Sequence, residues 1–398
     1  MRMRAWVIGL IMGIMGLMSF GGEVMSGMGN LRKVRFADMP GWRQADHRAA
    51  LAAFRRSCKR MMARARMRPS RFGGERRDWV LPCLGAPHAP LTQRGARRFF
   101  ERYFTPVTVQ PDGRPSGIFT GYFEPDVEGS LKKSARYPWP VLARPADLVR
   151  FTKAEEKATG LRYGRYVDGG PAPYYTREEI ENGALEGRGL EIVWLKSIVD
   201  RFFMHIQGSG RVILKEGGAL RLTYGGKSGH PFTGIGRKML ERGLIRKSQL
   251  SMQGIRKWLE AHPKQAREIM WLNKSYVFFR ATRLPDPRLG AFGAQGVQLA
   301  PLTSLAVDYH FWPYGAPVWL DTRVPGAHGK GFVSFRRLML AQDTGSAIRG
   351  AVRGDIYFGF GREAGERAGR MNARARMIVL LPNRLARRLL APLWACCP

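Results

Sequence analysis

The chain has 398 residues, 44% of them hydrophobic and 24% charged, which is ordinary for a globular protein and allows two or three domains with sizeable cores. The 66 Lys and Arg residues against 31 Asp and Glu give a net charge of +35, which favours a polyanionic partner such as nucleic acid, anionic lipid or a carboxylate-bearing polymer. Four cysteines are too few for a disulfide scaffold, and the seven histidines form no group with zinc-ligand spacing, so no metal site is predicted.

Residues 1–27 have the pattern of a secretory signal peptide or an N-terminal membrane anchor. The basic start "MRMR" precedes the uncharged, mostly apolar run "AWVIGLIMGIMGLMSF", which is short for a stable membrane span. No cysteine lies between Met1 and Ser57, so there is no lipobox cysteine for lipid attachment. We therefore expect export, and the segment allows contact with a membrane.

Residues from about 30 to 105 are predicted to be mostly helical. The runs "DHRAALAAFRRSCKRMM" and "LTQRGARRFFERYF" repeat apolar residues at helical spacing. Cys58 lies on the first run, and Cys83 follows in "WVLPCLGA". Either the two cysteines form a disulfide that closes one loop, or they are two buried thiols. The sequence does not choose between these alternatives.

The rest of the chain is dominated by β-strand patterns. "FTPVTVQPDGRPSGIFTGYFEPDVEGS" has a Pro-Asp-Gly turn between extended runs, and "FFMHIQGSGRVILKEGGALRLTYGG" is typical of hairpins. Two helical runs follow, and Ser248 is the predicted N-cap of the first. From about 275 to 385, short strands separated by turn residues predict a barrel rather than a parallel α/β sheet.

Two motifs suggest chemistry that the sequence then excludes. "YGGKSGH" contains Gly-Lys-Ser at 226–228, but the first glycine of a phosphate-binding loop would fall on Arg221, so no nucleotide cofactor is predicted. Asp343-Thr344-Gly345 matches the tripeptide of aspartic proteases, whose chemistry needs two such carboxylates sharing a proton. The later acid in "GDIY" is not a second copy, so a protease is not expected.

The stretch "AQDTGSAIRGAVRGDIYFGFG" fits the cleavage of a glycosidic bond better. That reaction needs an acid to protonate the leaving oxygen, and if the sugar closes on its own hydroxyl the same carboxyl then acts as the base. The acid must hold its proton, and the apolar neighbours of Asp355 predict a raised pKa, which a nearby Asp343 would raise further. Arg349 and Arg353 would oppose this effect, so we expect both to face solvent or the polymer.

Several long motifs lie in a fixed order between Gly117 and Pro382. They are "GIFTGYFEP", "PYYTREEI", "SIVDRFFMHIQGSGRV", "RLTYGGKSGHPFTGIGRKMLERGLI", "SMQGIRKWLEAHP", "NKSYVFFR", "SLAVDYHFWPYGAPVWLDT" and "AQDTGSAIRGAVRGDIYFGFGREAGERAG". In this order they resemble the membrane-bound lytic murein transglycosylase A family, which carries a C-terminal three-aspartate (3D) domain. The three aspartates are Asp308 in "AVD", Asp343 in "QDTG" and Asp355 in "GDIY".

The resemblance implies a mainly β protein with N-terminal helices, in which a deep groove separates a double-psi-like β-barrel domain from a smaller inserted β domain. The barrel domain is expected at 28–142 and 286–390, with the 3D domain in its C-terminal part, and the insert at 143–285. The family's acid and base corresponds to Asp355, with Asp343 and Asp308 in supporting roles, and Glu124 is expected to be structural. Residues matching the family's groove-lining, substrate-binding motifs are Thr120, Gly121, Tyr122, Gln207, Ser209, Tyr224, Gly225 and Lys227.

The implied activity is that of a lyase, a lytic transglycosylase of the Gram-negative periplasm. It would cleave the β-1,4 bond between N-acetylmuramic acid and N-acetylglucosamine of peptidoglycan without water, leaving a 1,6-anhydromuramoyl end. The implied partners are peptidoglycan strands, with membership of a cell-wall complex allowed. The alternative is a non-catalytic wall-binding protein. Nucleic acid is not an expected partner, because the chain has no recognisable nucleic-acid module. Around Asp308 the chain departs from the family, since Trp312 and Tyr314 replace smaller aliphatic residues.

Overall fold

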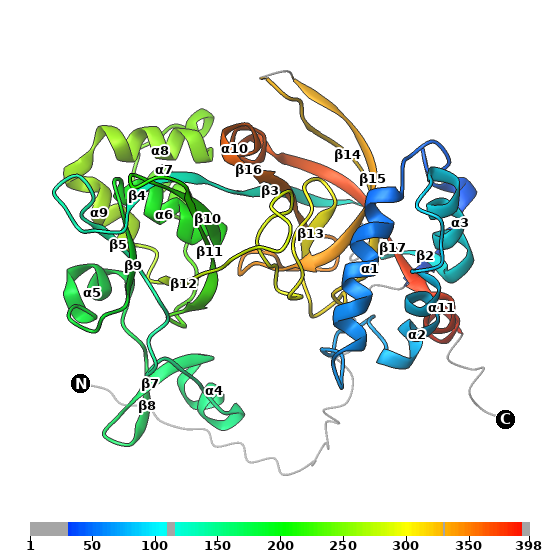
Figure 1. Cartoon of the computed structure of the whole chain (residues 1–398), viewed down its shortest axis with the longest axis horizontal. Coiled ribbons are helices and arrows are strands. Elements are labelled where there is room, and N and C mark those ends of the chain that lie inside the picture. Colours follow the sequence, from blue (N-terminus) through cyan, green and yellow to red (C-terminus); the bar gives the residue numbers. More distant parts are fainter. Residues whose placement is uncertain (1–30, 110–115, 329–330, 392–398) are drawn as a thin grey trace, which may run out of the picture.

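The computed structural model describes residues 31–109, 116–328 and 331–391 (Figure 1). The N-terminal segment predicted as a signal peptide or anchor lies outside these residues. Within them, no helix has both the length and the apolar character needed to cross a bilayer.

A closed six-stranded barrel forms the centre of the molecule. Its strands follow the order β17-β14-β15-β13-β16-β3, and β3 pairs again with β17, which closes the sheet on itself. The pairs β13–β15 and β16–β3 are parallel, and the others are antiparallel. The prediction of a mainly β barrel is confirmed. Its strands are β3 (Ser116–Glu124), β13 (Ser304–Val307), β14 (Pro317–Pro325), β15 (Phe332–Asp343), β16 (Gly354–Phe360) and β17 (Asn372–Pro382).

Helices from the N-terminal region pack against one side of the barrel, as predicted. In Figure 1 they lie to the right, together with the last helix of the described chain. Their aromatic side chains, among them Trp42 and Phe54, join the barrel's Trp319 in one buried core. The elements here are β1 (Leu31–Lys33), η1 (Phe36–Asp38), α1 (Arg48–Met62), α2 (Arg76–Gly85), α3 (Gln93–Tyr103), β2 (Phe104–Val109) and α11 (Asn383–Leu390).

Cys58 and Cys83 form a disulfide, so of the two alternatives for these cysteines the disulfide holds. It joins α1 to α2 across a sequence separation of 25 residues. The N-terminal helices are therefore covalently connected as well as packed.

A second domain is built on a six-stranded sheet of order β12-β11-β10-β4-β9-β5. Its strands are β4 (Asp126–Ser130), β5 (Trp139–Leu142), β9 (Glu191–Leu195), β10 (Ser209–Leu214), β11 (Ala219–Lys227) and β12 (Val277–Ala281). A small sheet of β6 (Val149–Arg150), β7 (Tyr163–Val167) and β8 (Gly170–Ala172) lies beside α4 (Lys153–Thr159). The other helices are α5 (Arg177–Glu179), η3 (Ile180–Ala184), α6 (Ile198–Gln207), α7 (Ile235–Glu241), η4 (Lys247–Gln249), α8 (Met252–Ala261) and α9 (Pro263–Trp271).

Two local predictions differ from the structure. The expected boundary between the barrel domain and the insert, at residue 143, lies later in the chain than the strand pairing indicates. The chain leaves the barrel after β3, and β4 and β5 already belong to the second sheet. The N-cap of α8 is Ser251, whose side chain accepts a hydrogen bond from Gly254 N at 3.1 Å, rather than Ser248. Ser248 instead lies in the short turn η4, which precedes the helix.

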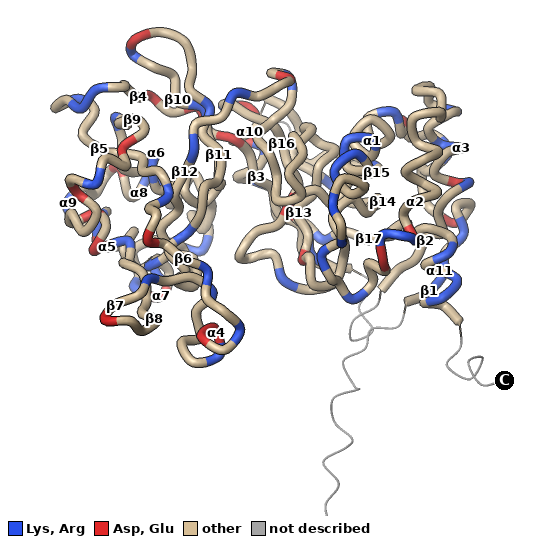
Figure 2. Tube along the Cα trace, turned by 60° about the horizontal axis from the view of Figure 1, so that its bottom comes forward, with Lys and Arg blue, Asp and Glu red and all other residues tan. Residues whose placement is uncertain are grey.

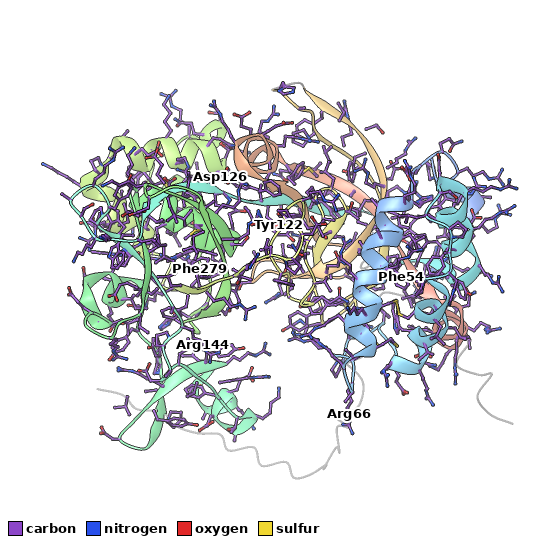
Figure 3. The ribbon with its side chains drawn as sticks, in the orientation of Figure 1. Phe54, Arg66, Tyr122, Asp126, Arg144 and Phe279 are labelled. Carbon is purple, nitrogen blue, oxygen red and sulfur yellow. A yellow bond between two sulfur atoms is a disulfide. The ribbon has the colours of Figure 1, made fainter. Side chains whose placement is uncertain are left out.

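The two domains meet along β3 and the elements that follow β16. Helix α10 (Gly361–Arg370) packs on β3, and Arg221 of β11 forms an ion pair with Glu124 at 3.2 Å. In Figure 3, Tyr122 of β3 lies between the second domain and the N-terminal helix that carries Phe54. Lys and Arg residues are distributed over both domains rather than concentrated in one (Figure 2).

Candidate active site

One row of residues runs across three neighbouring barrel strands and the end of a fourth. Ala306 of β13 pairs with Asp343 on one side and with Asp355 on the other, and Asp355 pairs in turn with Thr120 of β3. Laterally paired residues in a sheet point to the same face. The row therefore presents two carboxyl groups and a hydroxyl on one surface of the barrel wall.

Asp355 is held by its neighbour on β3. Thr120 Oγ1 donates a hydrogen bond of 2.8 Å to Oδ1 of Asp355, and the described residues provide no donor to Oδ2. Burial raises the pKa of Asp355 to about 6, while Thr120 and Arg353 lower it and the charge of Asp343 raises it. A carboxyl with this pKa is partly protonated near neutral pH, as general acid catalysis requires.

Asp343 has both oxygens engaged. Its Oδ1 accepts hydrogen bonds from the backbone N–H groups of Ala294 and Thr344, each at 2.9 Å, and Oδ2 accepts from Tyr122 OH at 2.9 Å. Burial raises the pKa of this carboxyl, against the opposing effect of the three hydrogen bonds. A β-bulge at Gln342 brings Asp343, rather than its neighbour, into register with Ala306.

Asp308 holds the loop that connects the other two acids. Its Oδ2 accepts from Gly350 N at 2.9 Å, and its Oδ1 accepts from the backbone and ring nitrogens of His310. Burial raises the pKa of Asp308, but the hydrogen bonds from Gly350 and His310 outweigh it and hold the pKa below its ordinary value. Asp308 is thus an ionised anchor for the 344–350 loop, not a proton donor.

The two arginines of this segment behave differently. Arg349 is exposed, as expected. Arg353 is half-buried, and its Nη2 donates to Thr120 Oγ1 at 2.9 Å, so the expectation that it faces solvent or the polymer is wrong. The reason is that Arg353 directly precedes β16, where its guanidinium also reaches the carbonyl oxygens of Ile118 and Gly354. Thr120 therefore accepts from a cation and donates to Asp355.

Alternation along β3 places three polar side chains on the face of the acids. They are Thr120, Tyr122 and Glu124, at positions separated by two. Tyr357 of β16 lies 5.2 Å from the Tyr122 ring and donates to Glu124 at 2.7 Å. Glu124 is fully buried and paired with Arg221, so its predicted structural role agrees with its position. The sequence analysis did not identify Tyr357 as a site residue, although the same alternation within "GDIYFG" places its side chain on the face of Asp355.

Two of the predicted glycines are needed for close packing. A Cβ on Gly121 would come within 2.5 Å of the Phe358 ring and 3.0 Å of the α10 backbone, so this position faces α10 rather than the acids. A Cβ on Gly225 would meet the backbone of Phe279 at 2.9 Å, at the bulge where β11 pairs with β12. Both glycines position strands that carry other predicted residues.

The second domain contributes Gln207 and Lys227 to contacts across the domain boundary. Gln207 ends α6, and its Oε1 accepts from Phe123 N of β3 at 3.1 Å. Lys227 Nζ contacts Ser346 Oγ at 3.3 Å, in the loop that follows Asp343. Burial and the charges of Arg349 and Arg162 lower the pKa of Lys227, which places three cations close together.

Ser209 and Tyr224 make no side-chain contact with the acids in the described structure. Ser209 is buried opposite Thr223 of β11, and Tyr224 lies on the same strand and is 47% exposed. An exposed aromatic side chain is suited to packing on the apolar face of a sugar. Among the described residues, no group of three or more His, Cys, Asp and Glu side chains is arranged to hold a metal ion.

Two family models match this chain. Residues 118–280 match the MltA specific insert domain, and residues 303–381 match the 3D domain. The membrane-bound lytic murein transglycosylase from Agrobacterium tumefaciens is a similar solved structure, with 35% identity and a TM-score of 0.82 over 90% of this chain and 99% of that chain. The structure of Escherichia coli MltA with bound chitohexaose has 25% identity and a TM-score of 0.64, over 89% of this chain and 94% of that chain.

A curated relative gives the same family. The membrane-bound lytic murein transglycosylase A of Escherichia coli strain K12 is 32% identical over 265 residues, which is 66% of this chain and 65% of that protein. The match thus spans slightly less than two thirds of that relative's length. From the two family models, the shared fold and these identities, the chain belongs to the membrane-bound lytic murein transglycosylase A (MltA) family.

Proposed function

We propose that the protein is a peptidoglycan lytic transglycosylase in which Asp355 is first the acid and then the base. The observation that carries this proposal is the position of Asp355: a carboxyl with a pKa of about 6, held through one oxygen by Thr120 and adjoining Asp343 across Ala306. Family membership supplies the class of reaction, and the geometry supplies a group able to perform both proton transfers.

The proposed reaction conserves every atom of the strand. Asp355 donates its proton to the bridging oxygen as the bond from that oxygen to C1 of N-acetylmuramic acid breaks, which leaves an oxocarbenium-like centre at C1. The C6 hydroxyl of the same sugar then bonds to C1 and gives its proton to the Asp355 carboxylate. The products are an N-acetylglucosamine end and a 1,6-anhydromuramoyl end, and Asp355 is again protonated.

The neighbouring acid supports a route without water. A hydrolase uses a second carboxylate to attack C1 or to activate water. Asp343 accepts three hydrogen bonds through its two oxygens, from Ala294, Thr344 and Tyr122, so neither oxygen is free for that role. In the proposal Asp343 instead raises the pKa of Asp355 through its charge.

Residues of barrel strand β3 and of the second domain would together hold the strand against the acids. We assign Tyr122 and Tyr224 to sugar faces, and Thr120, Gln207 and Ser209 to hydroxyl and N-acetyl groups. Lys227, with Arg162 and Arg349 nearby, suits the lactyl carboxylate of muramic acid. Chitohexaose is a β-1,4-linked amino-sugar chain, and its presence on Escherichia coli MltA supports this class of substrate.

We also propose that the protein acts outside the cytoplasm, in the periplasm, with residues 1–27 directing export or retaining it at a membrane. The basic and apolar pattern of that segment supports this location. Cell fractionation of the full chain tests it. Recovery with the periplasmic or membrane fraction would support the proposal, and recovery in the cytoplasm would contradict it.

Digestion of purified murein sacculi tests the activity. The wild-type protein should release anhydromuropeptides that mass spectrometry identifies, and Asp355→Asn should release none while keeping the wild-type circular dichroism spectrum. Asp168→Asn, in the exposed turn between β7 and β8, is the matched control and should retain activity. Sacculus binding by the wild type without soluble product would identify a wall-binding protein instead.

A further inference from the structure

A pocket lies between the end of α1 and the segment after Asp308. Its floor is connected to the active site, because Ala294 donates to Asp343 and the next residue, Gln295, lines the pocket. Its lining includes Arg64, Arg68, Gln295, Tyr309, Trp312 and Tyr314.

One buried polar group of this lining lacks a partner in the described structure. Gln295 is 2% exposed and its Nε2 makes no hydrogen bond, whereas the hydroxyl of Tyr314, which is 7% exposed, has Thr344 as a neighbour. An unpaired buried donor costs about 1–3 kcal/mol, so such a group is normally paired with water or with a ligand.

A relay of hydrogen bonds identifies which side-chain atom of Gln295 is left without a partner. Ser304 donates to Gln342 Oε1 at 2.6 Å, so the amide nitrogen of Gln342 must be the group that contacts Ser57 Oγ at 2.8 Å. Ser57 then accepts from Gln342 and has its own proton left to donate, at 2.8 Å, to Gln295 Oε1. The unpartnered atom of Gln295 is therefore its NH₂ group, which is a donor.

The remaining polar groups of the pocket also offer protons. Arg64 spans the wall and donates to Gln295 O at 3.3 Å, and Arg68 lies over the Tyr309 ring with its guanidinium carbon 3.4 Å from the ring centroid. Tyr309 OH accepts from Arg162 of the second domain at 3.3 Å, so its own proton is available. No Asp or Glu is among the lining residues. Guanidinium groups combined with neutral donors are suited to a carboxylate.

We propose that this pocket binds a carboxylate of the acidic peptide attached to muramic acid, and so makes the enzyme prefer strands that carry peptide. This inference rests on the proposed function, because it takes a peptidoglycan strand to lie across Asp355. The pocket adjoins the acids without containing them, so a strand and its peptide are held by different groups. Trp312 and Tyr314 form part of its wall.

Tyr314→Phe is the most direct variant, since it removes one hydroxyl from the pocket wall and leaves the ring in place. Arg68→Gln removes a charge at the mouth of the pocket. Matched controls are Tyr103→Phe on α3 and Arg66→Gln, which is exposed two residues before Arg68 and does not line the pocket.

The measurement is kcat/KM on peptide-bearing glycan strands divided by kcat/KM on strands from which an amidase has removed the peptides. Each test variant should lower this ratio about tenfold, the effect of losing one hydrogen bond to a charged group, and the controls should not change it. An unchanged ratio in both test variants, with both substrates still cleaved, would overturn the pocket assignment and leave the proposed function intact.

Calorimetry tests the pocket assignment even if the wild type cleaves neither the peptide-bearing strands nor the strands without peptides. The dipeptide L-Ala-γ-D-Glu should bind the wild-type protein and bind Tyr314→Phe about tenfold more weakly, and its fully amidated form should not bind. Equal binding by acetate or inorganic phosphate would mean that the pocket takes any small anion, which would overturn the peptide assignment. Loss of cleavage together with normal dipeptide binding would contradict the proposed function alone.

Discussion

Asp343 and Asp355 are the two lateral neighbours of Ala306, one on each side of β13. Two strand spacings separate their backbones by about 10 Å, while their side chains share one face of the barrel wall. Burial is the main cause of the raised pKa of Asp355, and at this separation the charge of Asp343 adds a smaller increase, without the shared proton of a protease dyad. This arrangement supports the proposal of one proton-transferring acid, Asp355, with a fixed neighbouring charge.

Arg353 sets part of the pKa of Asp355. Its positive charge lowers that pKa, so Arg353→Gln should raise it and move the alkaline limb of the kcat/KM profile to higher pH. The measurement is kcat/KM from pH 4 to pH 9 on purified strands. Arg94→Gln, an exposed change on α3, is the control. A shift of the limb to lower pH in Arg353→Gln would contradict this account.

Ionisation of Asp355 should lower the free energy of unfolding as the pH rises. An aspartate with an ordinary pKa of 3.8 ionises in the unfolded chain well before Asp355 ionises at about 6 in the folded chain. Between these values the folded protein binds more protons than the unfolded one, so stability falls with rising pH, by at most about 3 kcal/mol. Asp355→Asn has no proton to lose and should be more stable than the wild type at pH 8.

Urea unfolding of the wild type and Asp355→Asn at pH 4 and pH 8 measures this difference. The gap in the free energy of unfolding should be small at pH 4 and should widen at pH 8 in favour of the variant. A gap that is the same at both pH values would mean that Asp355 has no raised pKa.

Gly121 should be intolerant of even a methyl group. A Cβ there would come within 2.5 Å of the Phe358 ring and 3.0 Å of the Ala368 backbone, and α10 cannot easily move away. Gly121→Ala should destabilise the protein by about 1–3 kcal/mol, as overpacking does, and should displace Thr120 from Asp355. Gly331→Ala, where nothing lies within 4 Å, is the matched control in thermal unfolding and activity assays. Wild-type stability in Gly121→Ala would refute the packing argument.

The disulfide should matter for stability rather than for catalysis. Cys58 and Cys83 close a loop of 25 residues between α1 and α2, and in the chain-entropy account such a bond contributes about 3 kcal/mol. Reductant should lower the free energy of unfolding by about that amount, while initial rates at 25 °C remain unchanged. Reductant should have no effect on the double variant Cys58→Ser/Cys83→Ser. Equal sensitivity of that variant to reductant would contradict the assignment.

The sequence could predict the fold class and the identity of the central acids, because both depend on short motifs of consecutive residues. The "GDIY" and "QDTG" motifs identified Asp355 and Asp343, and short strands in the last third of the chain indicated a barrel. The path of the chain was harder to predict. β4 follows β3 after a single residue, Pro125, and no composition change marks the point where the chain passes into the second sheet.

Other features depend on contacts between distant residues and have no local signal. The orientation of Arg353 is set by Thr120, which lies 233 positions earlier, and not by its neighbours in the loop. The close packing at Gly121 comes from α10, and the donor relay that ends at Gln295 passes through Ser304, Gln342 and Ser57. These contacts form only in the folded barrel, so no local sequence pattern predicts them.

The most direct test of the central claim is digestion of purified glycan strands in ¹⁸O-labelled water, followed by mass spectrometry of the new ends. If Asp355 accepts the proton of the C6 hydroxyl and no water takes part, the wild-type products will be 1,6-anhydromuramoyl ends without ¹⁸O, and Asp355→Asn will produce none. New reducing ends that carry one ¹⁸O atom, or undiminished cleavage by Asp355→Asn, would contradict the account.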